Sequence, residues 1–145
     1  MMWILKTEPE TYSWDDLVKD GGTFWSGVRN YTARNNLKAM KQGERCFIYH
    51  SVGPKELVGI AEIVKEHYPD PTMELDEVKK GWVVVDVKAK ERLASPVTLA
   101  QLKAHKKLAS MVLVKQSRLS VCPLSAEEAK LILALSLRMS SGTAA

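Results

Sequence analysis

Three apolar segments in the middle of the chain constrain its fold more than any other feature. Residues 44–51, 57–66 and 82–91 are rich in valine, isoleucine and aromatic residues, which is the composition of β-strands. A turn, Val52–Lys55, joins the first two, and a longer polar connection, "YPDPTMELDEVKKG", joins the last two. Because no helix separates these segments, the sequence favours strands that pair in sequential order and mostly antiparallel.

Shorter strands are predicted near both ends of the chain. Residues 2–6 are apolar and stop before Glu8-Pro9, which indicates a buried first strand that ends at a residue unable to donate a ladder hydrogen bond. Residues 111–114 and 119–122 are short apolar runs around "KQSR" and are also predicted as strands. The total is five or six short strands.

Four helices are predicted, each with a capping side chain before its first turn. The caps are Ser13, Asn30, Thr98 and Ser125. At three of these starts a residue that can complete a capping box follows three positions later: Asp16, Gln101 and Glu128. The first helix is expected to end at Gly21-Gly22 and the second at Gly43.

These elements predict an α+β fold, a small and mostly antiparallel barrel of five or six strands decorated by short helices. The 145 residues suit one domain, which we place at residues 1–138. Residues 139–145 are expected to form a flexible tail. No repeat, linker or low-complexity segment divides the chain.

Charge and cysteine content narrow the possible partners and compartment. Lysine and arginine number 21 against 17 acids, a net charge of +4 that mildly favours a polyanionic partner. Cys46 and Cys122 lie in apolar runs, which indicates free buried thiols in a reducing compartment. No segment has the pattern of a signal peptide or a membrane span. We expect a monomer that acts in the cytoplasm, or in the nucleus of a eukaryote, with no membrane partner.

The usual catalytic and metal-binding patterns are missing from the sequence. His50, His67 and His105 stand alone, without the neighbours that metal ligands need. Gly22 and Gly27 have the outer spacing of a phosphate-binding loop, but the lysine and hydroxyl of that motif are not there. We therefore expect no metal, no cofactor and no catalysis.

The stretch "GGTFWSGVRNYTARNN", residues 21–36, combines aromatic rings, polar side chains and cations. Recognition of a base taken out of its stack needs an aromatic platform, groups for the base edge and cations for the phosphates. The same residues also fit a core strand that runs into a helix with a solvated cationic face. Taken alone, the residues favour the core interpretation.

Two further segments have the same ambiguity. In "FIYHS" the strand is apolar on both faces, so His50 is either a core histidine with its hydrogen bonds satisfied or a polar group at a cavity. The segment "VKQSRLSV" is either an ordinary turn or a loop that supplies amide and guanidinium donors at the mouth of a barrel.

The chain resembles the EVE domain family, a branch of the PUA-like superfamily, over about residues 2 to 137. The resemblance rests on "WILKTEPETYSWDDL", "GGTFWSGVRNYTARNNLKAMKQGE", "FIYHS", "VGIAEIVKEHYPDPT", "WVVVDVKAKERLASPVTLAQLK" and "MVLVKQSRLSVCPLSAEE". It implies a PUA-like pseudo-barrel that reads a modified base in nucleic acid, either a modified cytosine in DNA or a modified RNA nucleotide.

The resemblance also implies a site. The residues expected to bound the base pocket are Lys6, Thr7, Trp25, Ser26, Gly27, Val28, Asn30, Tyr31, Tyr49, His50 and Ser51. Those expected at its phosphate-binding rim are Arg29, Arg34, Asn35, Lys38, Gln116, Ser117 and Arg118. Phe24 and Leu37 are assigned to the core. The turn after "YHS" is too short to offer much surface, so few contacts are expected from it.

The function predicted from the sequence is thus a single-domain, non-catalytic reader of a flipped, modified base. Two alternatives remain open. One is an enzyme that acts on nucleotides or modified RNA with His50 as acid or base. The other is a scaffold that binds a small molecule or a protein and has no affinity for nucleic acid.

Overall fold

The computed structural model describes residues 2–144, with side chains for residues 2–138. Six strands form one sheet in the order β2-β5-β4-β3-β1-β6. Their bounds are β1 Met2–Thr7, β2 Thr23–Phe24, β3 Arg45–His50, β4 Glu56–Pro69, β5 Val83–Thr98 and β6 Val121–Leu124. Only the β1–β3 pair is parallel, so the predicted mixed, mostly antiparallel sheet of an α+β fold is confirmed.

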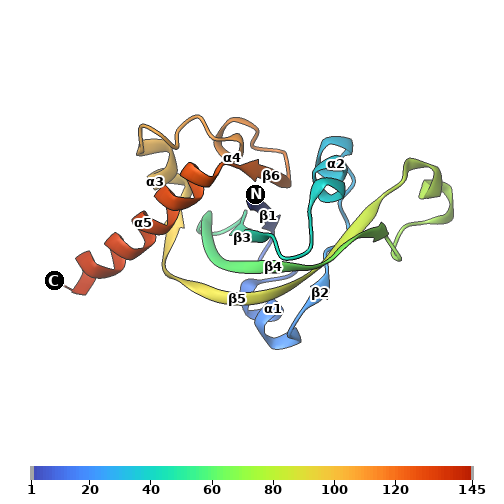
Figure 1. The fold of residues 1–145 in the computed structure, drawn as a ribbon, viewed down its shortest axis with the longest axis horizontal. Coiled ribbons are helices and arrows are strands. Elements are labelled where there is room, and N and C mark those ends of the chain that lie inside the picture. The colour runs from blue at the N-terminus through green and yellow to red at the C-terminus, as the bar shows by residue number, and fades with distance from the viewer. Residues whose placement is uncertain (1, 145) are drawn as a thin grey trace.

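The β4–β5 hairpin is the frame of the molecule and curves across its whole width (Figure 1). Its two strands hold 14 and 16 residues, and their register shifts at four places. Register irregularities of this kind increase strand bending and twist. The sheet ends at β2 on one side and β6 on the other, so the expected barrel is a strongly curved sheet whose ladder does not close.

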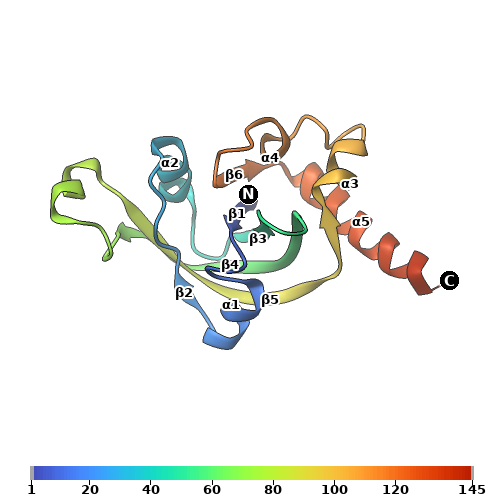
Figure 2. The ribbon, with the colours of Figure 1, turned by 180° about the vertical axis from the view of Figure 1, so that it is seen from behind.

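The helices lie on both sides of this hairpin, as Figures 1 and 2 show from opposite directions. Above it in both views are α2 (Tyr31–Ala39), α3 (Leu99–Ala104) and α4 (Val112–Lys115), and below it is α1 (Trp14–Asp20). The last helix, α5 (Ala126–Ala144), packs against β5 and then extends away from the sheet. No helix within residues 2–144 is long and apolar enough to cross a membrane.

All four predicted helix starts are confirmed. Ser13 and Thr98 each form a complete capping box, with Asp16 and Gln101 respectively. Asn30 accepts a hydrogen bond from the amide of Ala33. The remaining pair, Ser125 and Glu128, exchanges hydrogen bonds between side chain and backbone in both directions. Each cap satisfies amide groups that a helix start leaves without an internal partner.

The structure differs from the sequence prediction at several element boundaries. Residues 111–114 were predicted as a strand, which is wrong, because Val112–Lys115 is a single helical turn. A four-residue apolar run has too few residues for its periodicity to distinguish strand from helix. The polar connection after β4 contains the 3-10 helix η1, Leu75–Lys80. The flexible tail predicted at residues 139–145 stays a prediction, because the side chains of these residues and the whole of residue 145 lie outside the described part of the structure.

The core lies between the curved sheet and the helices. Trp14 of α1 is 2% exposed and packs directly on Gly59 of β4, where an added Cβ would lie 2.5 Å from the indole ring. The core assignment of Leu37 is confirmed, and both cysteines are free and buried as expected. Burial raises the pKa of the Cys46 thiol to about 12, so this thiol stays protonated at neutral pH.

Candidate functional site

A cavity of about 330 Å³ opens where the end of β1 meets β2. Its lining residues are Lys6, Thr7, Thr11, Tyr12, Thr23, Phe24, Trp25 and Ser26, and we call it the aromatic cavity. Its volume falls at the lower end of the range for small-ligand sites. Three rings, four hydroxyl-bearing residues other than tyrosine, and one lysine surround it, without a carboxylate.

The three aromatic rings form the walls of this cavity. Tyr12 and Trp25 meet edge to face, with ring centroids 6.1 Å apart and planes at 85°. Trp25 is 8% exposed and Phe24 is 41% exposed. The assignment of Phe24 to the core is therefore wrong, because β2 is only two residues long and leaves this ring at the mouth of the cavity.

The polar groups of the cavity differ in whether they already have partners. Thr7 Oγ1 donates to the carbonyl of Tyr12 at 2.6 Å, and the Tyr12 hydroxyl donates to Asp20 at 2.7 Å. Burial and the Asp20 carboxylate raise the pKa of Tyr12 to about 12, so the phenol stays neutral. Trp25 Nε1 has no hydrogen-bond acceptor within the described residues and is not sealed from solvent, which leaves this N–H available to a ligand.

The segment from Trp25 to Asn30 is held at three points. The amide of Trp25 donates to the carbonyl of Val85, which ties the segment to β5 at 2.8 Å. Gly27 has a φ of +81°, a conformation that side chains rarely adopt, and its amide donates to Asp70 at 3.2 Å. Asn30 caps α2. The cavity wall is thereby fixed before any ligand arrives.

Asp70 is the buried anchor of this segment, with a side chain that is completely inaccessible. It accepts hydrogen bonds from the guanidinium of Arg29 at 2.9 Å and from both the amide and hydroxyl of Thr72. Burial opposes ionisation of this carboxyl, but the hydrogen bonds from Thr72, Arg29 and Gly27 outweigh it and lower its pKa. Arg29 is thus a structural ion-pair partner in this structure.

Two arginines and two rings form a stack beside this anchor. Tyr31 lies on Trp82 with ring centroids 5.1 Å apart and planes at 23°. Arg34 lies over the Tyr31 ring at 5.0 Å and also donates to the carbonyl of Lys80, while Arg29 lies over Trp82 at 5.7 Å. Such a stack contributes stability on its own, so these side chains have an interaction that needs no ligand.

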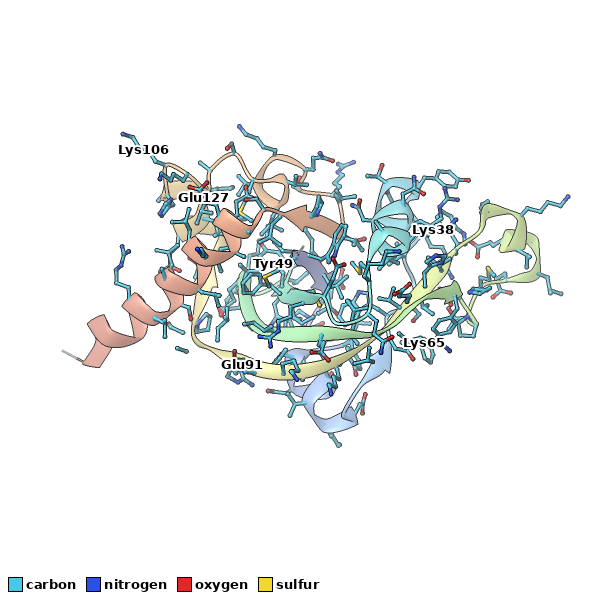
Figure 3. All side chains as sticks on the ribbon, in the orientation of Figure 1. Lys38, Tyr49, Lys65, Glu91, Lys106 and Glu127 are labelled. Atoms are coloured by element: carbon cyan, nitrogen blue, oxygen red, sulfur yellow. The ribbon has the colours of Figure 1, made fainter. Side chains whose placement is uncertain are left out.

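A second, smaller cavity of about 100 Å³ shares Lys6 with the aromatic cavity. Its lining residues are Lys6, Tyr49, Ser51, Lys55, Leu99, Lys103, Leu113, Val114 and Ser117, and we call it the lysine cavity. Lys6 Nζ donates to the carbonyl of Ser117 at 2.9 Å and lies 5.9 Å from the centre of the Tyr49 ring. Burial lowers the pKa of Lys6. Figure 3 shows Tyr49 near the middle of the molecule, on β3.

A third, more open hollow adjoins the lysine cavity through Ser117. It is lined by Asn30, Thr32, Lys115, Gln116, Ser117, Arg118 and Leu119. The linings of the three hollows contain four lysines and one arginine, and none of their residues is acidic. We call the surface formed by these three hollows the cationic surface, because its five cations have no acidic residue beside them in the lining.

Ten of the eighteen site residues predicted from the sequence line at least one of the three hollows. The aromatic cavity takes Lys6, Thr7, Trp25 and Ser26, the lysine cavity takes Lys6, Tyr49, Ser51 and Ser117, and the third hollow takes Asn30, Gln116, Ser117 and Arg118. The residues that line none of the three are Gly27, Val28, Arg29, Tyr31, Arg34, Asn35, Lys38 and His50.

His50 has a structural role in this arrangement. Its Nε2 accepts a hydrogen bond from the amide of Trp14 at 3.1 Å, at the first residue of α1. This bond requires an unprotonated Nε2. Burial lowers the pKa of His50, although the nearby carboxylates of Glu56 and Asp15 act in the opposite direction. The ring is therefore kept neutral and is already engaged.

Sequence reasoning missed twelve lining residues of the three hollows. They are Thr11, Tyr12, Thr23 and Phe24 in the aromatic cavity, Lys55, Leu99, Lys103, Leu113 and Val114 in the lysine cavity, and Thr32, Lys115 and Leu119 in the third hollow. The short turn that holds Lys55 was expected to contribute little, yet it places this lysine beside a helix that begins 44 residues later in the chain. No group of three His, Cys, Asp or Glu residues able to hold a metal ion occurs among residues described by the structure.

The comparisons with known proteins agree on one family. The model of the EVE domain matches residues 1–135. Thymocyte nuclear protein 1 from Homo sapiens is 39% identical, in an alignment that covers 92% of this chain and 72% of that protein. The protein of the same name from Gallus gallus is 38% identical, covering 92% of this chain and 67% of the relative.

Solved structures show the same fold. An NMR structure of a protein from Rhodopseudomonas palustris is 49% identical, with a TM-score of 0.86, over 93% of this chain and 92% of that one. Human thymocyte nuclear protein 1, crystallised in complex with DNA that contains 5-methylcytosine, is 38% identical, with a TM-score of 0.84, over 93% of this chain and 96% of that one.

Proposed function

This chain belongs to the EVE domain family, and we propose from that premise that it is a non-catalytic reader that holds a modified base in its aromatic cavity. The observation that carries the proposal is the cavity itself, with three rings, a free indole N–H and no acidic lining residue. A flat base can contact the rings, and its edge can accept a hydrogen bond from Trp25 Nε1.

We propose modified cytosine in DNA as the first ligand to test, and a modified RNA nucleotide as the second. The human relative that shares this fold was solved with DNA containing 5-methylcytosine, which supports that order. Cytosine has an acceptor oxygen and an acceptor nitrogen on its pairing edge, which suit an N–H donor. A 5-methyl group adds apolar surface, which the exposed ring of Phe24 at the cavity mouth can cover.

We propose that the target base flips out of the duplex to enter the aromatic cavity. A base within a duplex cannot present its pairing edge or both faces to a cavity, so the target nucleotide has to leave the stack. The bases of the strand would then lie outside the cavity while its phosphates follow the cationic surface beside Lys6. We expect a monomer to suffice, acting in the cytoplasm, or in the nucleus of a eukaryote.

The non-catalytic part of the proposal is supported by the state of the reactive side chains. Burial raises the pKa of both cysteine thiols, which keeps them in the poorly nucleophilic protonated form. His50 is bound to the amide of Trp14 and lines none of the three hollows. No residue on the cationic surface is an evident general base.

The experiment that tests this function compares duplexes that differ only in one 5-methyl group. Burial of one methyl is worth about 0.8 kcal/mol, so wild-type protein should prefer the methylated duplex roughly fourfold. Phe24→Ala should weaken binding to the methylated duplex by about 1 to 3 kcal/mol, the usual value for a stacked ring. Leu75→Ala, at a residue that is 92% exposed on η1, is the control and should bind like wild type.

Equal binding of both duplexes by the wild-type protein would contradict the proposal that it recognises 5-methylcytosine. The same comparison with modified RNA oligonucleotides then decides whether another modified base is the ligand. Uniform weak binding to every oligonucleotide, unaffected by Phe24→Ala, would reduce the protein to a general polyanion binder.

A further inference from the structure

Three lysines approach the lysine cavity from three separate parts of the chain. Lys6 comes from the end of β1, Lys55 from the turn between β3 and β4, and Lys103 from α3. None of the three forms an ion pair with any residue that the structure describes. Like charges that converge without a carboxylate repel one another, and an anion between them would relieve that repulsion.

The other lining groups of the lysine cavity are suited to the same kind of ligand. The Tyr49 hydroxyl has no hydrogen-bond partner within the described residues and is not sealed from solvent. Burial raises the pKa of Tyr49, which keeps this hydroxyl a neutral donor. Ser51 adds a second hydroxyl. Ammonium and hydroxyl donors together match an anion with several acceptor oxygens.

The size of the lysine cavity limits the anion further. Its volume of about 100 Å³ is less than a third of the 330 Å³ of the aromatic cavity. Leu99, Leu113 and Val114 contribute an apolar part of the lining, without donors for a base edge. The cavity therefore suits one compact tetrahedral group better than a second base.

We propose that the lysine cavity binds the backbone phosphate next to the base held in the aromatic cavity. Lys6 lines both cavities, so the two ligand groups would lie on either side of one side chain, as a base and its neighbouring phosphate do in a strand. This inference rests on the proposed function, and adds to it a phosphate site formed by Lys55 and Lys103. The ligand of the lysine cavity is thus a phosphate group of the bound nucleic-acid strand.

The test combines a protein variant with a chemically altered strand. The variant is Lys55→Gln with Lys103→Gln, and the matched control is Lys65→Gln with Lys130→Gln, which removes the same charge from exposed positions elsewhere. Figure 3 shows Lys65 on the distal part of β4, away from Tyr49. Two altered strands are used. In one, the phosphate on the 5′ side of the modified base is replaced by a neutral methylphosphonate, and in the other, the phosphate on the 3′ side is replaced.

With the wild-type protein and the control, one of the two methylphosphonates should weaken binding roughly tenfold, the size of a charge-assisted contact. In the Lys55/Lys103 variant that penalty should disappear, because the contact is already lost. The slope of log affinity against log salt should also fall by about one in total, because the two lysines contact the same phosphate. An undiminished methylphosphonate penalty in the variant would overturn the proposal.

The two proposals can fail separately in this design. If the Lys55/Lys103 variant binds as tightly as the control and still prefers the methylated duplex, the phosphate site is wrong and the reader function stands. If every protein lacks a preference for the modified base but the variant still loses the methylphosphonate penalty, the phosphate site stands and the reader function is wrong. Saturable binding of inorganic phosphate that is lost in the variant, with no effect of either methylphosphonate, would overturn the assignment to a strand.

Discussion

The buried carboxylate of Asp70 accepts a hydrogen bond from the guanidinium of Arg29 at 2.9 Å, across 41 residues of sequence. The same carboxylate oxygen accepts a hydrogen bond from the amide of Gly27, so Asp70 holds both Gly27 and Arg29 in place. Arg29 is therefore used to position the Trp25–Asn30 segment, and its charge is already paired before nucleic acid binds.

Arg29→Ala should lower the free energy of unfolding by about 1.5 to 3 kcal/mol, because a buried carboxylate loses a charged hydrogen-bond partner. Urea denaturation at neutral pH measures the change. Arg118→Ala is the control, an exposed arginine without an ion pair to any described residue, and should change stability by less than about 0.5 kcal/mol. An Arg29→Ala protein as stable as wild type, but weaker in binding oligonucleotides, would favour the phosphate role expected from the sequence.

Gly59→Ala should be strongly destabilising, because its new Cβ would lie 2.5 Å from the ring of Trp14. Trp14 is 2% exposed and cannot move without disturbing α1, so we expect a loss of about 1 to 3 kcal/mol. Thermal or urea unfolding gives the value. Replacing the ring as well, in a Gly59→Ala, Trp14→Leu double variant, should cost less than the sum of the two single changes. Additive losses would show that the two residues do not clash.

Stability should decrease on acidification because of His50. Burial lowers the pKa of its ring below the ordinary histidine value, so the unfolded chain takes up a proton before the folded one as the pH falls. The neutral ring therefore contributes its full stabilisation at a pH above the ordinary histidine pKa. This stabilisation is lost as the pH falls from that value through the lower pKa of His50 in the folded protein. Protonation also removes the acceptor for the amide of Trp14.

Urea midpoints at about pH 7.5 and about pH 5 measure this effect, since the interval spans the usual range of histidine titration. His50→Gln should be less stable than wild type at the higher pH and should show a smaller difference between the two conditions. His67→Gln, at an exposed histidine, should keep the wild-type difference. Equal pH dependence in wild type and His50→Gln would contradict the structural role of His50.

Local signals in the sequence were sufficient for four helix starts and for the three middle strands. The capping boxes of Ser13 and Thr98 depend on residues three positions apart, and both were predicted correctly. The three middle strands were located by their valine and isoleucine content, but β4 and β5 extend past the predicted ends to Pro69 and Thr98. Each extension pairs with the part of the other strand that was predicted, as Pro69 does with Val83 and Arg92 with Gly59, and composition alone does not indicate this.

The site was harder to predict because it depends on contacts between distant segments. The pairing of Arg29 with Asp70 joins two loops and gives no periodic signal, so the sequence suggested a free cation. Phe24 and Trp25 are adjacent, and only the two-residue length of β2 determines that both reach the aromatic cavity. Lys55 and Lys103 converge through the path of β4 and β5, which brings a turn and a later helix together.

The most direct test of the base pocket is the indole N–H resonance of Trp25 during titration with a duplex containing 5-methylcytosine. The side chains of Trp3 and Trp82 already donate to Glu44 and Glu77, whereas Trp25 has a free donor at the cavity. Loss of one resonance in Trp25→Phe assigns the signal. We predict that this resonance shifts at saturation and that those of Trp3 and Trp82 stay nearly unchanged. An unshifted Trp25 resonance in the fully bound protein would contradict a base in the aromatic cavity.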